Sequence, residues 1–139
     1  MKIEVNTLST EEGIALFREA LGLLEELKDI GLKGFCVTSA LTGEYLTAEF
    51  CTYIDKEEFS KNVGSLIKNA EKLRFGEDEE EEEELLGVVI RTANTAIIVI
   101  PAGERGILTI VTAPKDEVSL NKIIHNSREA AILIGKSLK

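Results

Sequence analysis

Few side chains in this sequence are suited to catalysis. It holds one histidine, His125, and two cysteines, Cys36 and Cys51. A nucleophilic thiol needs a general base beside it, and a catalytic histidine needs an orienting acid and a nucleophile within reach. His125 falls in a helix-like pattern and the cysteines in strand-like patterns, and nothing in their spacing brings them together. We therefore expect a surface histidine and two small core thiols; a thiol or histidine enzyme is the less favoured hypothesis.

No phosphate-binding loop is predicted. Gly135-Lys136-Ser137 has the composition of the end of such a loop, but it follows a helix pattern rather than a strand. The glycine that the motif requires upstream is also missing, since Ala130 holds that place. We expect no nucleotide cradle and no cofactor.

Residues 77–84 form an unbroken run of eight acidic side chains. The chain has 25 Asp and Glu against 16 Lys and Arg, a net charge of −9; without the run, 17 acidic residues would face 16 basic ones. The run lacks the spaced ligands and turn glycine of a calcium loop, and contiguous like charges repel and stay extended. We expect a solvated linker, or alternatively a weak contact with a basic partner surface, and no metal site.

Composition excludes several classes of protein. A net acidic chain without a basic run is a poor nucleic-acid binder. The longest apolar stretch, residues 96–102, is far shorter than the ~20 residues that span a membrane. Residues 1–6 lack the apolar region of a signal peptide, which favours a cytoplasmic protein with reduced cysteines. A length of 139 residues predicts a single domain, 1–139.

The hydrophobic periodicity predicts three helices and five strands in the order αββαβββα. Expected strands are residues 34–39 and 45–53, joined as a hairpin, and then 85–92, 95–102 and 106–113, joined as an antiparallel meander. The first helix is expected to begin at a capping box of Ser9 and Glu12 and to end at Gly31. The second is expected to begin at a capping box of Asp55 and Glu58 and to end at Gly76. The last is expected to be capped by Asp116 or Ser119 and to run to Leu138. The acidic run links the second helix to the third strand.

The strands are apolar on both faces, so both faces of the sheet need cover. Five strands make a sheet about 24 Å wide, and helices pack ~10 Å apart, so each face takes two. With three helices, we expect the first and last on one face and the second alone on the other. Part of that face would stay bare, and an exposed apolar patch usually marks an interface. The simplest solution is a two-fold homodimer; the alternative is a monomer whose second helix lies diagonally.

The second helix is locally basic beside its apolar stripe. Lys61, Lys68 and Lys72 lie along it. A charged helix face is often simply solvated, but an amphipathic helix beside a bare sheet face is also what a protein partner recognises. Both interpretations remain open at this point.

The sequence resembles the roadblock family. Residues 34–39 and 41–48 are similar to its first hairpin: a glycine, an apolar strand ending near serine, a tight turn and a return strand of apolar and small residues. Residues 96–101 and 106–111 resemble its fourth and fifth strands, and residues 120–138 its final helix. Thr42-Gly43 stands where the family has an Asp-Gly-like turn, and the acidic insertion is unusual.

This resemblance implies an α/β (α+β) sandwich of profilin or roadblock type, with a five-stranded antiparallel sheet and helices on both faces. It implies a non-enzymatic homodimeric regulator or scaffold of a small Ras-like GTPase, with no cofactor. Lys61, Lys68 and Lys72 are then candidate partner contacts. The alternative is a small-molecule-sensing or general protein-interaction module of profilin-like shape. Carried over from the family, the dimer surface would comprise Phe59, Val63, Leu66, Ile67, Ala70, Val88 and Ile90.

Overall fold

The computed structural model describes residues 10–73 and 85–138. Ser9 and the predicted linker 77–84 lie outside them. Within the described ranges the order αββαβββα is confirmed. The elements are α1 (Glu11–Glu25), a short 3-10 turn η1 (Lys28–Ile30), β1 (Leu32–Ser39), β2 (Tyr45–Phe50), α2 (Lys56–Glu71), β3 (Val88–Arg91), β4 (Ala96–Ala102), β5 (Gly106–Thr112) and α3 (Glu117–Ser137).

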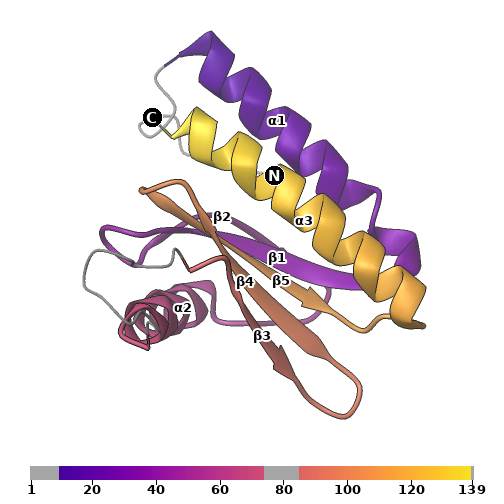
Figure 1. Cartoon of the computed structure of the whole chain (residues 1–139). Coiled ribbons are helices and arrows are strands. Elements are labelled where there is room, and N and C mark those ends of the chain that lie inside the picture. Colours follow the sequence, from indigo (N-terminus) through magenta and orange to yellow (C-terminus); the bar gives the residue numbers. More distant parts are fainter. Residues whose placement is uncertain (1–9, 74–84, 139) are drawn as a thin grey trace, which may run out of the picture.

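The described strands form one antiparallel sheet in the order β2-β1-β5-β4-β3. The predicted hairpin is β1–β2 and the predicted meander is β3–β4–β5. They are joined by pairing between β1 and β5, which the local sequence pattern does not specify. This junction makes β2 and β3 the two edge strands of the sheet (Figure 1).

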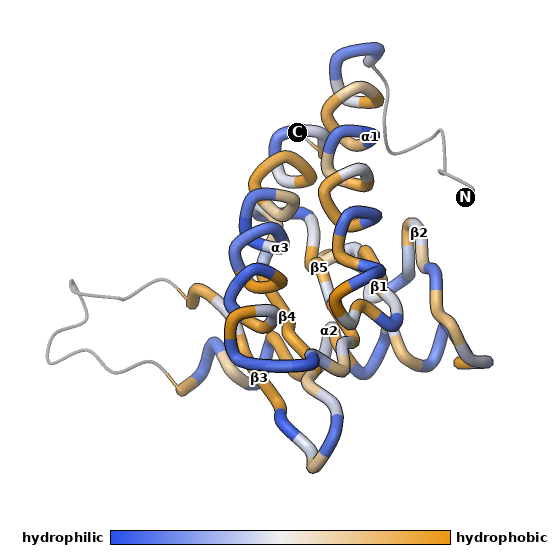
Figure 2. Tube along the Cα trace, turned by 90° about the vertical axis from the view of Figure 1, so that its right-hand side faces the viewer, coloured by the Kyte–Doolittle hydropathy of each residue, from blue (hydrophilic) through white to orange (hydrophobic). Residues whose placement is uncertain are grey.

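The described helices divide two to one between the faces of the sheet, as predicted. Helices α1 and α3 lie side by side on one face, and α2 lies alone on the other (Figure 1). The larger core, including Phe17, Phe35 and Leu108, fills the space beneath α1 and α3. Figure 2 shows why these two helices pack there: hydrophobic and hydrophilic residues alternate at helical period along both.

One helix start differs from the predicted one, and the structure decides between the two candidates for another. Thr10 rather than Ser9 caps α1, because its hydroxyl accepts the backbone N–H of Gly13 at 2.9 Å. Asp116, not Ser119, caps α3, where its carboxylate accepts the Ser119 N–H at 2.7 Å. That hydrogen bond stabilises the charged carboxylate and lowers the pKa of Asp116.

Several elements are shorter than predicted. Helix α1 ends at Glu25, and the chain reaches Gly31 (φ 125°) only after the 3-10 turn. Strand β2 ends at Phe50 rather than residue 53, and α2 at Glu71. Strand β3 covers residues 88–91 rather than 85–92, since among the described strands it pairs with β4 alone.

The Gly135-Lys136-Ser137 tripeptide has a packing explanation. Gly135 lies where α3 meets the β4–β5 turn, and a Cβ there would stand 2.7 Å from the backbone nitrogen of Gly103. The glycine lets helix and turn approach closely, in agreement with rejecting a phosphate loop. In the described residues no helix combines the length and hydropathy needed to cross a bilayer.

Glycine 34 provides a test of the packing between β1 and β2. A Cβ on Gly34 would lie 2.5 Å from Cδ1 of Phe50 and 2.7 Å from the carbonyl oxygen of Glu49. We expect Gly34→Ala to lower the free energy of unfolding by about 1–3 kcal/mol, measured by urea denaturation. Gly22 of α1 has no neighbour within 4 Å of such a Cβ, so Gly22→Ala should be stabilising by about 0.5–1 kcal/mol. Equal effects of the two substitutions would contradict the packing described here.

Candidate protein-interaction surface

Helix α2 is held across the sheet by contacts near its first turns. The Ser60 hydroxyl lies 2.8 Å from that of Thr38 on β1, and both side chains are fully buried. The ring of Phe59 packs edge-on against Phe50 of β2, with centroids 5.2 Å apart. A hydroxyl pair buried in an apolar layer must stay paired, so this contact fixes where α2 crosses β1.

These contacts also define the two flanks of α2. Lys61 lies beside Gly43, in the β1–β2 turn. Phe59 lies beside Phe50, at the opposite end of β2. The helix therefore crosses the strands, with one flank toward the β1–β2 turn and the other toward the far end of the sheet.

The strand register shows which part of the sheet α2 covers. One cross-strand row runs Cys36, Thr109, Val99 and lies fully buried beneath the helix. The next row toward the far end runs through all five described strands. We call it the bare row, and its members, in sheet order, are Phe50, Gly34, Val111, Ile97 and Ile90.

The bare row is apolar and incompletely covered. Phe50, Val111 and Ile97 are half-buried, and Ile90 is 40% exposed. It ends at β3, which is paired with β4 on one side and forms the sheet edge on the other. An edge strand presents a line of backbone N–H and C=O groups that another strand can pair with. Within residues 10–73 and 85–138, the chain thus leaves an apolar strip that ends at an open strand edge.

The seven predicted interface residues divide into two groups. Val63 and Ile67 are each only 5% exposed and pack with Val99 and Ile107 into the chain's own smaller core. Phe59, Leu66, Ala70 and Val88 are half-buried, and Ile90 is exposed. Only the second group can reach another molecule without α2 moving.

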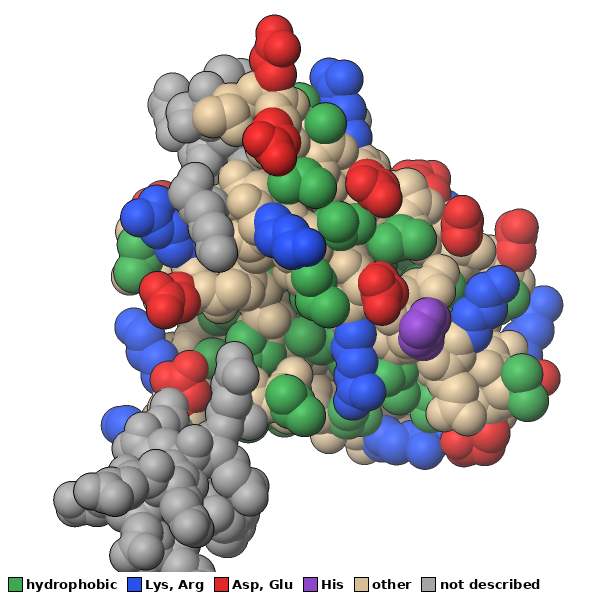
Figure 3. Space-filling view, turned by 45° about the horizontal axis from the view of Figure 1, so that its top comes forward, with side chains coloured by type: hydrophobic (Ala, Val, Ile, Leu, Met, Phe, Trp, Pro, Cys, Tyr) green, Lys and Arg blue, Asp and Glu red, His purple; other side chains and the backbone are tan. Residues whose placement is uncertain are grey.

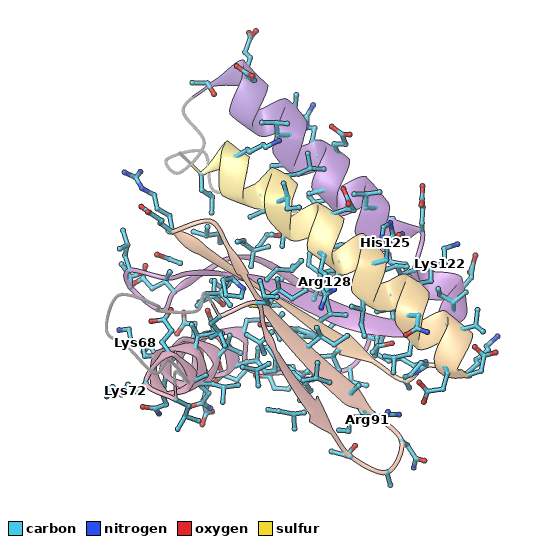
Figure 4. The ribbon with its side chains drawn as sticks, in the orientation of Figure 1. Lys68, Lys72, Arg91, Lys122, His125 and Arg128 are labelled. Atoms are coloured by element: carbon cyan, nitrogen blue, oxygen red, sulfur yellow. The ribbon has the colours of Figure 1, made fainter. Side chains whose placement is uncertain are left out.

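The three lysines of α2 lie on the flank opposite the bare row. Lys61, Lys68 and Lys72 are exposed, and at about 100° per residue they fall within about 40° of arc around the helix. Lys61 places this stripe toward the β1–β2 turn. Figure 4 shows Lys68 and Lys72 projecting from α2 away from the sheet. The separation of the basic stripe from the apolar flank is visible only once the helix is oriented.

The candidate catalytic residues are not brought together. Cys36 is buried beneath α2, and this burial raises the pKa of its thiol. The prediction of a second core thiol is wrong for Cys51, which is exposed because β2 ends one residue before it. His125 lies on the surface of α3, on the other side of the sheet, where it is the purple side chain of Figure 3. Among the described residues no three His, Cys, Asp or Glu side chains are placed to hold a metal ion.

A surface groove of about 490 Å³ lies between the β1–β2 turn and the start of α2. It gathers the polar and charged groups that a small-molecule site requires. Its lining residues are Ser39, Thr42, Glu44, Tyr45, Leu46, Glu57 and Lys61.

Comparison by sequence finds no relative: no protein-family model matches the chain, and no curated protein matches it significantly. Comparison by structure does. An MglB described with a tetrameric arrangement is 18% identical, with 89% of this chain and 90% of that chain covered at a TM-score of 0.69. Myxococcus xanthus MglB is 15% identical, and the alignment covers 94% of this chain and 95% of that chain at a TM-score of 0.64. A Roadblock/LC7 domain from Streptomyces avermitilis is 14% identical, with 83% of this chain and 91% of that chain covered at a TM-score of 0.60.

These alignments cover 83–95% of each chain, although only 14–18% of the residues are identical. At identities this low the likeness concerns the backbone architecture rather than particular side chains. The chain has the roadblock fold, the fold that its hairpin, meander and final helix led us to expect.

Proposed function

We propose that this protein is a homodimeric regulator or scaffold of a Ras-like GTPase, acting in the cytoplasm as a single domain without catalysis of its own. The observation that carries the proposal is the bare row, an apolar strip that crosses the sheet and ends at the open edge of β3. The roadblock fold supports it, since the family resemblance implies dimeric, GTPase-associated adaptors.

A second copy of the chain satisfies both features of this surface at once. With a two-fold axis beside β3, the two edge strands pair antiparallel and the two sheets become continuous. The bare rows then meet at Ile90, and the α2 helices approach each other over them. Such an isologous contact needs one self-complementary patch. That one structural neighbour is an MglB with a tetrameric arrangement agrees with self-association.

The basic stripe of α2 is suited to a second partner. It lies on the flank away from the proposed seam, so dimerisation leaves Lys61, Lys68 and Lys72 accessible. Clustered lysines steer and orient an acidic surface more than they add affinity. We assign this stripe to the GTPase.

A small-molecule-sensing module is the second candidate function. The groove beside Lys61, with Glu44 and Glu57 on its walls, is the observation that favours it. A ligand bound there would also lie next to the basic stripe.

A charge placed in the bare row should break the dimer. We expect Val111→Lys, and separately Ile90→Lys, to convert a dimer of the 15.2 kDa chain into a monomer, because each would bury an unpaired charge at the seam. The measurement is size-exclusion chromatography with light scattering at micromolar concentration. Val118→Lys is the matched control, since Val118 is an exposed aliphatic residue on α3. A native chain that is monomeric in this measurement would refute the homodimer.

Neutralising the acidic run should not weaken the dimer. Two copies of residues 77–84, which join α2 to β3 in sequence, would repel near the seam. Replacing them by Gln and Asn, or raising the salt concentration, should leave the dissociation constant unchanged or lower. Dissociation on replacement would show instead that the run holds the two chains together.

Reversing the basic stripe should weaken binding of the GTPase but not of the second copy. We expect Lys61→Glu, Lys68→Glu and Lys72→Glu together to weaken binding to a Ras-like GTPase from the same genome about tenfold or more, at about 0.2–1 kcal/mol per exposed pair before repulsion is added. Binding and GTP turnover are the readouts, and Lys122→Glu with Lys136→Glu on α3 is the control. Equal losses in both variants would point to net charge instead.

A further inference from the structure

The apolar flank of α2 carries an alternating stripe. Phe59, Asn62, Leu66, Asn69 and Leu73 are spaced by three, four, three and four residues, which places them within about 80° of arc. The helical turn continues to Leu73 through a 3.0 Å hydrogen bond from its N–H to the carbonyl oxygen of Ala70. We call these five residues the seam stripe.

The seam stripe is accessible along its length. Asn62 and Asn69 are exposed, Leu73 is 70% exposed, and Phe59 and Leu66 are half-buried. Among the hydrogen bonds of the described residues, neither asparagine side chain has a partner within its own chain. Two side-chain amides thus alternate with three large apolar groups on the flank that faces the bare row.

The stripe has nearly the same order of residue types in both directions. Read either way, it runs apolar, amide, Leu66, amide, apolar. A two-fold axis between two α2 helices sets them antiparallel, so each helix meets its own sequence reversed. With the axis near Leu66, Leu66 faces the partner's Leu66 and Phe59 lies beside the partner's Leu73. Asn62 then lies opposite the partner's Asn69, and the second such pair follows by symmetry.

We propose that Asn62 and Asn69 form reciprocal amide pairs across the α2–α2 seam, which select a second copy of this chain and fix its antiparallel register. The proposal rests on the homodimer proposed above. Each amide offers both donors and an acceptor, so one asparagine satisfies another. A shift in register, or a partner with an apolar residue there, would leave the amides buried and unpaired. Polar residues within helix seams are known to act in this way.

The rest of α2 supports the choice of occupant. The other flank presents Lys61, Lys68 and Lys72, and two copies meeting there would bring like charges together. The spacing of seven residues between Asn62 and Asn69 corresponds to about 10.5 Å along the helix. Because the same interval applies in both copies, the two amide pairs can form simultaneously.

Charge substitutions in the full chain test the pairing. In the proposed register, Asn62→Asp with Asn69→Asp, and Asn62→Lys with Asn69→Lys, each place like charges opposite one another, and each should weaken the homodimer at least tenfold. Mixing these two variants should restore a heterodimer. Asn62→Asp with Asn69→Lys places opposite charges together and should dimerise within about threefold of the native chain. Light scattering and sedimentation equilibrium measure all three.

Control variants separate the pairing from folding and net charge. Ser65→Asp and Ser65→Lys change the charge of α2 on its outer, exposed surface and should leave the dimer unchanged, and circular dichroism should show native thermal unfolding for every variant. A native dimer whose Asp/Lys variant is as weak as the like-charged ones would overturn the register, since Asn62 would then face its own copy. Like-charged variants that dimerise normally would overturn the seam stripe itself. A monomeric native chain would refute the homodimer and this inference together.

Discussion

The structure depends on a shortage of helices to cover the sheet: the three described α-helices pack against a five-stranded sheet that is apolar on both faces. Helices α1 and α3 lie on one face and enclose the larger core. The other face has α2 alone, fixed over β1 by the buried Thr38–Ser60 hydroxyl pair. A single helix is about 10 Å wide, so it cannot cover the sheet along the full length of its strands. What it leaves is the bare row.

This shortage also makes the two flanks of α2 unlike. The flank over the β1–β2 turn is free to be charged and carries Lys61 and Lys68, whereas the flank beside the bare row must suit an apolar neighbour and carries Phe59 and Leu66. One helix can therefore serve two contacts that do not compete.

Much of the fold could be predicted from the sequence because its determinants are local. Turn glycines such as Gly43 and Gly103, which adopt positive φ, mark the hairpins, and helical periodicity with simple counting gives the two-to-one cover. The β1–β5 pairing is non-local, and no local pattern encodes it. The candidate site was predicted less well for that reason: the dimer surface implied by the family resemblance included both Val63 and Leu66, but only the register and the orientation of α2 show that Val63 faces the chain's own core.

Backbone hydrogen exchange at the two sheet edges, followed as the chain is diluted, tests most directly the claim that a second copy covers the bare row. At high concentration those amides of Val88–Arg91 that point away from β4 should be protected, and dilution below the dissociation constant should release them. The amides of Tyr45–Phe50 in β2, at the opposite edge, should exchange at the same rate throughout. Rates in β3 that do not change with concentration while light scattering shows a dimer, or a concentration-dependent change confined to β2, would show that the second copy does not pair along β3.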